Sequence, residues 1–127
     1  MTERPPFQVS ARVRSFRYAL RGIAVVLHSQ HNAWIHAAAS LLVVAAGLAT
    51  GLGRLEWCAL VLAIVAVWVA EALNTAFEAL CDVASPSLHP MVERAKDVAA
   101  GAVLIAAIGA VIIGLLVFVP HVLGRAG

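Results

Sequence analysis

Three long runs without charged residues constrain the fold of this chain more than any other feature. Residues 33–52, 57–70 and 98–119 contain no Asp, Glu, Lys or Arg. The first and third runs reach the length of about 20 residues that an α-helix needs to cross a bilayer. The second run has fourteen residues and is too short alone, so its helix must continue through the acidic residues that follow. The sequence therefore predicts three membrane-spanning helices.

Composition agrees with residence in a membrane. Of 127 residues, 62% are hydrophobic and only 13% are charged, which leaves too few polar groups to coat a water-soluble globule. The length permits one domain, and three spans leave no room for a separate soluble catalytic domain. Any chemistry must therefore be carried by the membrane bundle itself.

The N-terminal segment before the first run has a different character. Its apolar residues recur every three or four positions, as on one stripe of a helix. They are Val9, Val13, Phe16, Leu20, Ile23 and Leu27. Three arginines project from another side: Arg14, Arg17 and Arg21. Such a helix can lie among lipid headgroups, or it can pack against the other helices of the bundle.

These patterns predict an all-α integral membrane bundle that forms a single domain over residues 1–127. We expect an amphipathic surface helix at 8–29 and spans at 33–52, 57–83 and 97–119. The first apolar run starts too far along the chain for a signal peptide, so we expect it to be retained. Basic residues crowd the N-terminal segment and the second connection, which places both on the cytoplasmic side.

Four polar residues share one face of the second span. At ~100° per residue they fall within an arc of about 80°. They are Glu71, Asn74, Glu78 and Asp82. A carboxylate near the membrane midplane costs roughly 3 kcal/mol, so its charge must be offset, and a divalent cation such as Mg²⁺ is a natural partner. A proton relay, an ion path or structural pairing between helices would also explain such a face.

A second polar pair, Lys96 and Asp97, stands at the entrance of the third span. If a helix begins there, its free amides and dipole suit an anion such as phosphate. Taken singly, Lys96 could be an interface anchor and Asp97 a helix cap. Acids for a metal, a lysine for phosphate and a location at the membrane together suggest phosphoryl transfer to a lipid.

Other signatures are missing. The sequence has no GxxxxGK[ST] loop and no protein-kinase motif set, which excludes a conventional soluble kinase fold. The histidines show no metal-ligand spacing, and we interpret them as interface or loop residues. They are His28, His31, His36, His89 and His121.

Several of these features resemble the signature of the bacterial diacylglycerol kinase and undecaprenol kinase family. They are the segment at 71–78, Asp82, the pair His89–Pro90 and the segment at 95–101. The resemblance extends to residues 16–22, to Asn32, Ile35 and His36, and to the three-span plan. The loop at residues 85–90 is closer in form to the undecaprenol kinase branch.

The resemblance implies a role for each polar residue of the second span. Glu71 resembles the family's catalytic base, Asn74 a residue that orients the site, and Glu78 a metal-binding glutamate. Gln30 stands where the family usually places a second metal-binding glutamate, and Trp34 stands where it usually has an arginine. The implied cofactor is Mg²⁺, with ATP as co-substrate.

For the remaining site residues the resemblance implies contacts with the nucleotide, made by Lys96, Asp97 and Asp82. It further implies a homotrimer in the bacterial cytoplasmic (inner) membrane, with the N-terminus and shared active sites facing the cytoplasm. The implied partners are ATP and a membrane lipid alcohol, undecaprenol or diacylglycerol, and we expect no nucleic acid. Two alternatives remain: a catalytically reduced homologue that binds lipid or nucleotide, and a small cation- or proton-coupled transporter that uses the acidic face.

Overall fold

The described part of the chain is helical, as the sequence predicted. The computed structural model describes residues 8–29, 31–85 and 89–124. These residues form four helices and no strand, which confirms the all-α class. The helices are α1 (Val9–Ser29), α2 (His31–Thr50), α3 (Arg54–Ala84) and α4 (Pro90–Gly124).

Three of the helices are long and apolar enough to cross a membrane, namely α2, α3 and α4. At 1.5 Å per residue, the 20 residues of α2 span about 30 Å, close to the thickness of the hydrocarbon core. The 31 residues of α3 and the 35 residues of α4 span about 46 and 52 Å. Both helices are therefore longer than the hydrocarbon core is thick. The predicted boundaries of their membrane-spanning parts remain a prediction.

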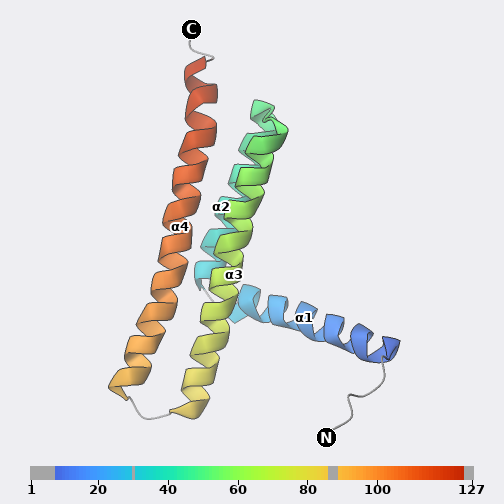
Figure 1. The fold of residues 1–127 in the computed structure, drawn as a ribbon, viewed down its shortest axis with the longest axis vertical. Coiled ribbons are helices and arrows are strands. Elements are labelled where there is room, and N and C mark those ends of the chain that lie inside the picture. The colour runs from blue at the N-terminus through green and yellow to red at the C-terminus, as the bar shows by residue number, and fades with distance from the viewer. Residues whose placement is uncertain (1–7, 30, 86–88, 125–127) are drawn as a thin grey trace, which may run out of the picture.

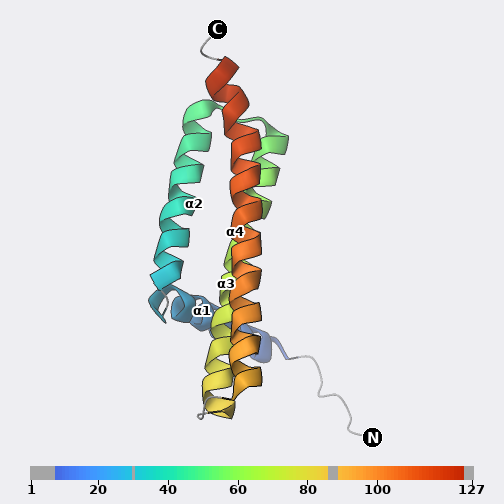
Figure 2. The same cartoon turned by 90° about the vertical axis from the view of Figure 1, so that its left-hand side faces the viewer.

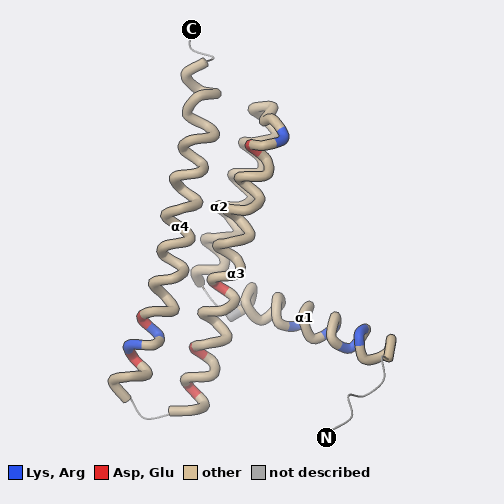
Figure 3. The backbone as a smooth tube through the Cα atoms, viewed as in Figure 1, with Lys and Arg blue, Asp and Glu red and all other residues tan. Residues whose placement is uncertain are grey.

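Helix α1 crosses the others at a large angle, at the end of the bundle where α2 begins (Figures 1 and 2). Helices α3 and α4 run antiparallel, share the most extensive helix contact, and continue past the level of α1. Lys, Arg, Asp and Glu gather along α1 and near the connection between α3 and α4, while α2 carries none (Figure 3). One end of the bundle is therefore much more charged than its middle.

A small apolar cluster lies at the opposite end, near the tight turn between α2 and α3. Leu52, Leu60 and Val117 are buried there, with Trp57 packed against them. In the turn Gly51 has a φ of +72°, a conformation that side chains disfavour. Most other large apolar residues are exposed along the helices, which suits contact with lipid or with another subunit.

Gly47 allows α2 to approach this cluster. A Cβ atom placed there would lie 2.7 Å from Trp57 Cη2, well inside van der Waals contact. We expect Gly47→Ala to destabilise the protein by about 1–3 kcal/mol, the usual range for overpacking. Gly109→Ala is the control, because a Cβ at Gly109 meets no atom within 4 Å. Thermal unfolding in detergent measures the difference, and equal melting temperatures for the two variants would contradict this packing.

Candidate active site

Glu71 is the most unusual side chain of the bundle. Among the described residues it is the largest one that is fully buried, with 1% of its surface exposed. Neither carboxylate oxygen has a hydrogen-bond partner in the part of the chain that the structure describes. A buried, unsatisfied carboxylate is costly, so its presence inside a spanning helix points to a function.

Helical spacing brings two further polar side chains of α3 beside Glu71. Asn74 and Glu78 line the same cavity of about 280 Å³, and Asn74 Nδ2 donates a hydrogen bond of 3.3 Å to Glu78 Oε1. Asn74 is itself buried, and its Oδ1 has no partner among the described groups. The cavity therefore presents several oxygen acceptors and few donors, which suits a proton donor or a hard cation.

The other walls of this cavity come from α2 and α4. Helix α2 contributes Asn32, Ile35 and His36. Helix α4 contributes small and aliphatic residues: Ala100, Val103, Leu104 and Ala107. Because two of the four residues in the α4 wall are alanines, space remains in front of the carboxylates.

His36 approaches Glu71 from α2, and the sequence interpretation missed this contact. Its Nε2 lies 3.6 Å from Glu71 Oε2. We interpreted all histidines as interface or loop residues, which is wrong for His36, because it is half-buried within α2 and faces the site. A histidine inside an otherwise uncharged run was the signal that could have marked it.

A second cavity, of about 480 Å³, lies further along α3 near its connection to α4. Asp82, Lys96 and Asp97 line it, together with His89 and Glu93. Lys96 Nζ donates a hydrogen bond of 2.5 Å to Asp82 Oδ1. The predicted acidic face is therefore divided, since Asp82 lines the second cavity while Glu71, Asn74 and Glu78 line the first.

The start of α4 differs from the prediction. The helix begins at Pro90, so Lys96 and Asp97 lie nearly two turns inside it. Their amides belong to the helical ladder, and the predicted anion-binding helix end and the Asp97 cap are both wrong at this position. Proline is favoured in a first helical turn, and the ring Nδ1 of His89 accepts a hydrogen bond of 3.2 Å from the Met91 amide.

The described residues do not form a complete metal site on their own. No three His, Cys, Asp or Glu side chains among them gather closely enough to hold an ion. Gln30 lies outside the described residues, and Trp34 is exposed near the start of α2. The oxygen donors of Asn74 and Glu78 nevertheless fit a hard cation such as Mg²⁺, which commonly completes its shell with water and substrate phosphates.

Comparison with known proteins agrees with this arrangement. A family model described as prokaryotic diacylglycerol kinase matches residues 17–118, which include every described site residue. The chain is 40% identical over 107 residues to an undecaprenol kinase of Bacillus subtilis (strain 168), covering 84% of this chain and 87% of that protein. It is 39% identical over 110 residues to a diacylglycerol kinase of Synechocystis sp., covering 86% of this chain and 63% of that protein. The chain therefore belongs to the prokaryotic diacylglycerol kinase family of lipid kinases.

Proposed function

We propose that this lipid kinase transfers the γ-phosphate of MgATP to the hydroxyl of a membrane lipid alcohol, undecaprenol or diacylglycerol. The observation that carries the proposal is the buried Glu71 carboxylate, whose two oxygens have no hydrogen-bond partner among the described residues and face a cavity shared with Asn74 and Glu78. Such a group can accept the proton that the lipid hydroxyl loses as it attacks phosphorus. Asn74, also buried and bonded to Glu78, orients the site.

The depth of the two cavities suits a lipid acceptor and a soluble phosphate donor. His36, which faces Glu71, lies five residues inside the start of α2, or about 7 Å along its axis. Asp82 lies eleven residues beyond Glu71, or about 16 Å further along α3. A lipid hydroxyl would thus reach the site from the membrane while the nucleotide occupies the aqueous end.

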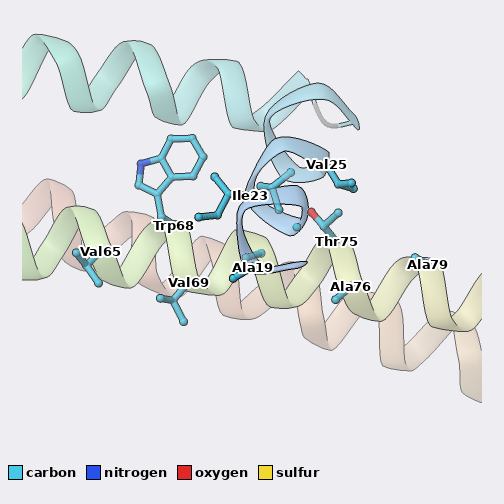
Figure 4. Close-up of a pocket in the computed structure, with 12 residues that line it drawn as sticks. Ala19, Ile23, Val25, Val65, Trp68, Val69, Thr75, Ala76 and Ala79 are labelled. Carbon is cyan, nitrogen blue, oxygen red and sulfur yellow. The ribbon is translucent and has the colours of Figure 1, made fainter. Parts of the chain in front are cut away.

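An apolar groove on another side of α3 supports a lipid substrate. It has a volume of about 740 Å³ and lies between α1 and α3, with Ile23 and Trp68 among its walls (Figure 4). Thr75 also lines it, and the Thr75 hydroxyl donates a hydrogen bond of 2.9 Å to the Glu71 carbonyl oxygen. The apolar lining of this groove suits the hydrocarbon chain of a lipid.

The charged cavity suits the nucleotide. We assign Lys96 and Asp97 to contacts with ATP, and Asp82 to the same site through its hydrogen bond to Lys96. A lysine close to phosphate acts as a point charge. We assign Mg²⁺ to Glu78 and Gln30, with the phosphates completing its shell, and a bound Mg²⁺ would neutralise charge on those phosphates.

We further propose a homotrimer in the bacterial cytoplasmic membrane, with shared active sites and the N-terminus on the cytoplasmic side. Small residues on α4 favour close helix approach, and they include Ala99, Ala100 and Gly101. The arginines of α1 and the basic residues near the start of α4 lie at the same end of the bundle (Figure 3). Basic residues favour the cytoplasmic side, where ATP is found.

Transfer of a labelled γ-phosphate from ATP to the lipid alcohol tests the proposal directly. The purified protein in mixed micelles is given ATP labelled in the γ-phosphate, Mg²⁺, and either undecaprenol or diacylglycerol. Labelled lipid phosphate that requires both Mg²⁺ and the lipid alcohol is the expected result, and the ratio of the two products identifies the preferred substrate. Binding of ATP and lipid with no labelled product would instead establish a catalytically reduced homologue.

Glu71→Gln should abolish turnover while the protein remains folded and membrane-inserted. The amide preserves the shape of the side chain but cannot accept the hydroxyl proton, a contribution typically worth about 10²–10⁴ in rate. Initial rates are compared at saturating substrates, with thermal unfolding as the control for folding. Retention of more than about a tenth of the wild-type rate would remove Glu71 from the role of base.

Lys96→Ala should raise the KM for ATP, or lower the rate, while the KM for lipid stays unchanged. The substitution removes a charge from the nucleotide cavity and leaves the apolar groove intact. Arg54→Ala is the matched control, because Arg54 is an exposed cation at the far end of α3. An effect of Lys96→Ala confined to the KM for lipid would contradict its assignment.

Gln30→Glu should lower the Mg²⁺ concentration needed for half-maximal activity, with less gain once Mg²⁺ saturates. A neutral amide can lend oxygen to the metal but contributes no charge, and a hard cation near lipid depends on that charge. Glu78→Gln should shift the half-saturation point in the opposite direction. Identical Mg²⁺ titrations for wild type and Gln30→Glu would exclude Gln30 from the metal shell.

A further inference from the structure

We infer that His36 is a positioning residue for the catalytic carboxylate, holding Glu71 Oε2 so that Oε1 faces the lipid hydroxyl. The inference rests on the proposed function, because it assigns Glu71 the role of base. It adds a residue of α2 to a site whose proposed catalytic and metal-binding groups, as far as the structure describes them, come from α3.

The contact joins two helices at the buried centre of the site. His36 Nε2 lies 3.6 Å from Glu71 Oε2, and the two side chains are 16% and 1% exposed. Both line the cavity of about 280 Å³ that also holds Asn74. No other described side chain forms an ion pair with Glu71.

The imidazole is held in place from both helices. The Trp68 ring of α3 meets it edge to face, with 6.4 Å between ring centroids and 68° between planes. Trp68 Nε1 donates a hydrogen bond of 3.1 Å to Ser40 Oγ, and the Ser40 hydroxyl donates one of 2.7 Å to the His36 carbonyl oxygen. Trp68 also lines the apolar groove, so this arrangement connects the groove to the carboxylate.

A contact that only joined α2 to α3 would not need to pair a histidine with a buried glutamate. The Trp68–Ser40 hydrogen bond already joins α2 to α3 without Glu71. A buried ion pair contributes little net stability, and apolar residues would join two helices at less cost. At 3.6 Å the imidazole remains just outside hydrogen-bonding distance of Oε2. Catalytic hydrogen bonds are often this long before substrate binds and tighten in the reactive complex.

The chain offers a matched control pair at the other end of the bundle. His121 Nδ1 of α4 lies 3.6 Å from Glu56 Oε1 of α3, the same separation as between His36 and Glu71. Glu56 Oε2 also accepts a hydrogen bond of 2.7 Å from the Gly53 amide, so this glutamate caps α3. The two histidines therefore differ in location rather than in the distance of their contact.

The test compares His36→Leu, His36→Gln and His121→Leu by steady-state kinetics with ATP and lipid varied separately. His36→Leu should lower kcat about tenfold or more, a partial loss of general-base catalysis, with both KM values changed less than about threefold. His36→Gln keeps an N–H donor near the position of Nε2 and should recover most of kcat. His121→Leu should leave kcat unchanged.

Three results would overturn the inference. These are an equal loss of kcat in His36→Leu and His36→Gln, a loss confined to the KM values, or an equal loss in His121→Leu.

Thermal unfolding of His36→Leu, Glu71→Gln and the double variant tests the contact without turnover. Shifts in melting temperature should be non-additive if the side chains interact, and additive shifts would refute the contact. If the wild-type protein makes no lipid phosphate the proposed function fails, while this cycle still decides the contact.

Discussion

A carboxylate held inside a membrane-spanning helix is the constraint around which the rest of this bundle is arranged. A charge at that depth costs several kcal/mol unless polar groups approach it. Helix α2 brings His36 to within 3.6 Å of Glu71, and α3 adds Asn74 to the same cavity. Helix α4 contributes a wall of small and aliphatic residues that leaves space in front of the acids. Three helices, α2, α3 and α4, thus meet around the buried carboxylate.

Helix length places the two polar cavities at different levels along α3. Helix α2 is barely long enough to cross the lipid core, whereas α3 and α4 continue beyond it and carry charged residues at their connected ends. The carboxylates of Glu71 and Glu78 lie between that charged end and the apolar part of α3. The apolar groove between α1 and α3 is lined by other residues of α3 than the acids. In the proposed function, the lipid hydroxyl meets Glu71 and the nucleotide occupies the cavity near the connection of α3 and α4.

Sequence reasoning succeeded where a signal lies within one helix. The uncharged runs predicted α2, α3 and α4, and the amphipathic period predicted α1. The 100° spacing placed Glu71, Asn74 and Glu78 on a common cavity wall. It failed where a property depends on two helices. The approach of His36 follows from how α2 packs on α3, which periodicity along α2 does not encode. One signal within a single helix was missed as well: the charged residues after Pro90 were interpreted as loop, although proline favours a first helical turn. The site roles themselves remain predictions.

The distribution of packing explains how the bundle tolerates unsatisfied groups at its site. The apolar cluster of Leu52, Leu60 and Val117 lies at the end remote from the carboxylates, where Trp57 fills the space beside Gly47. The most extensive helix contact, between α3 and α4, adds stability along the whole bundle. Near Glu71 the helices are instead separated by a cavity. This packing offsets the cost of the two Glu71 oxygens, which have no hydrogen-bond partner among the described residues and which the proposed function assigns to the hydroxyl of a lipid.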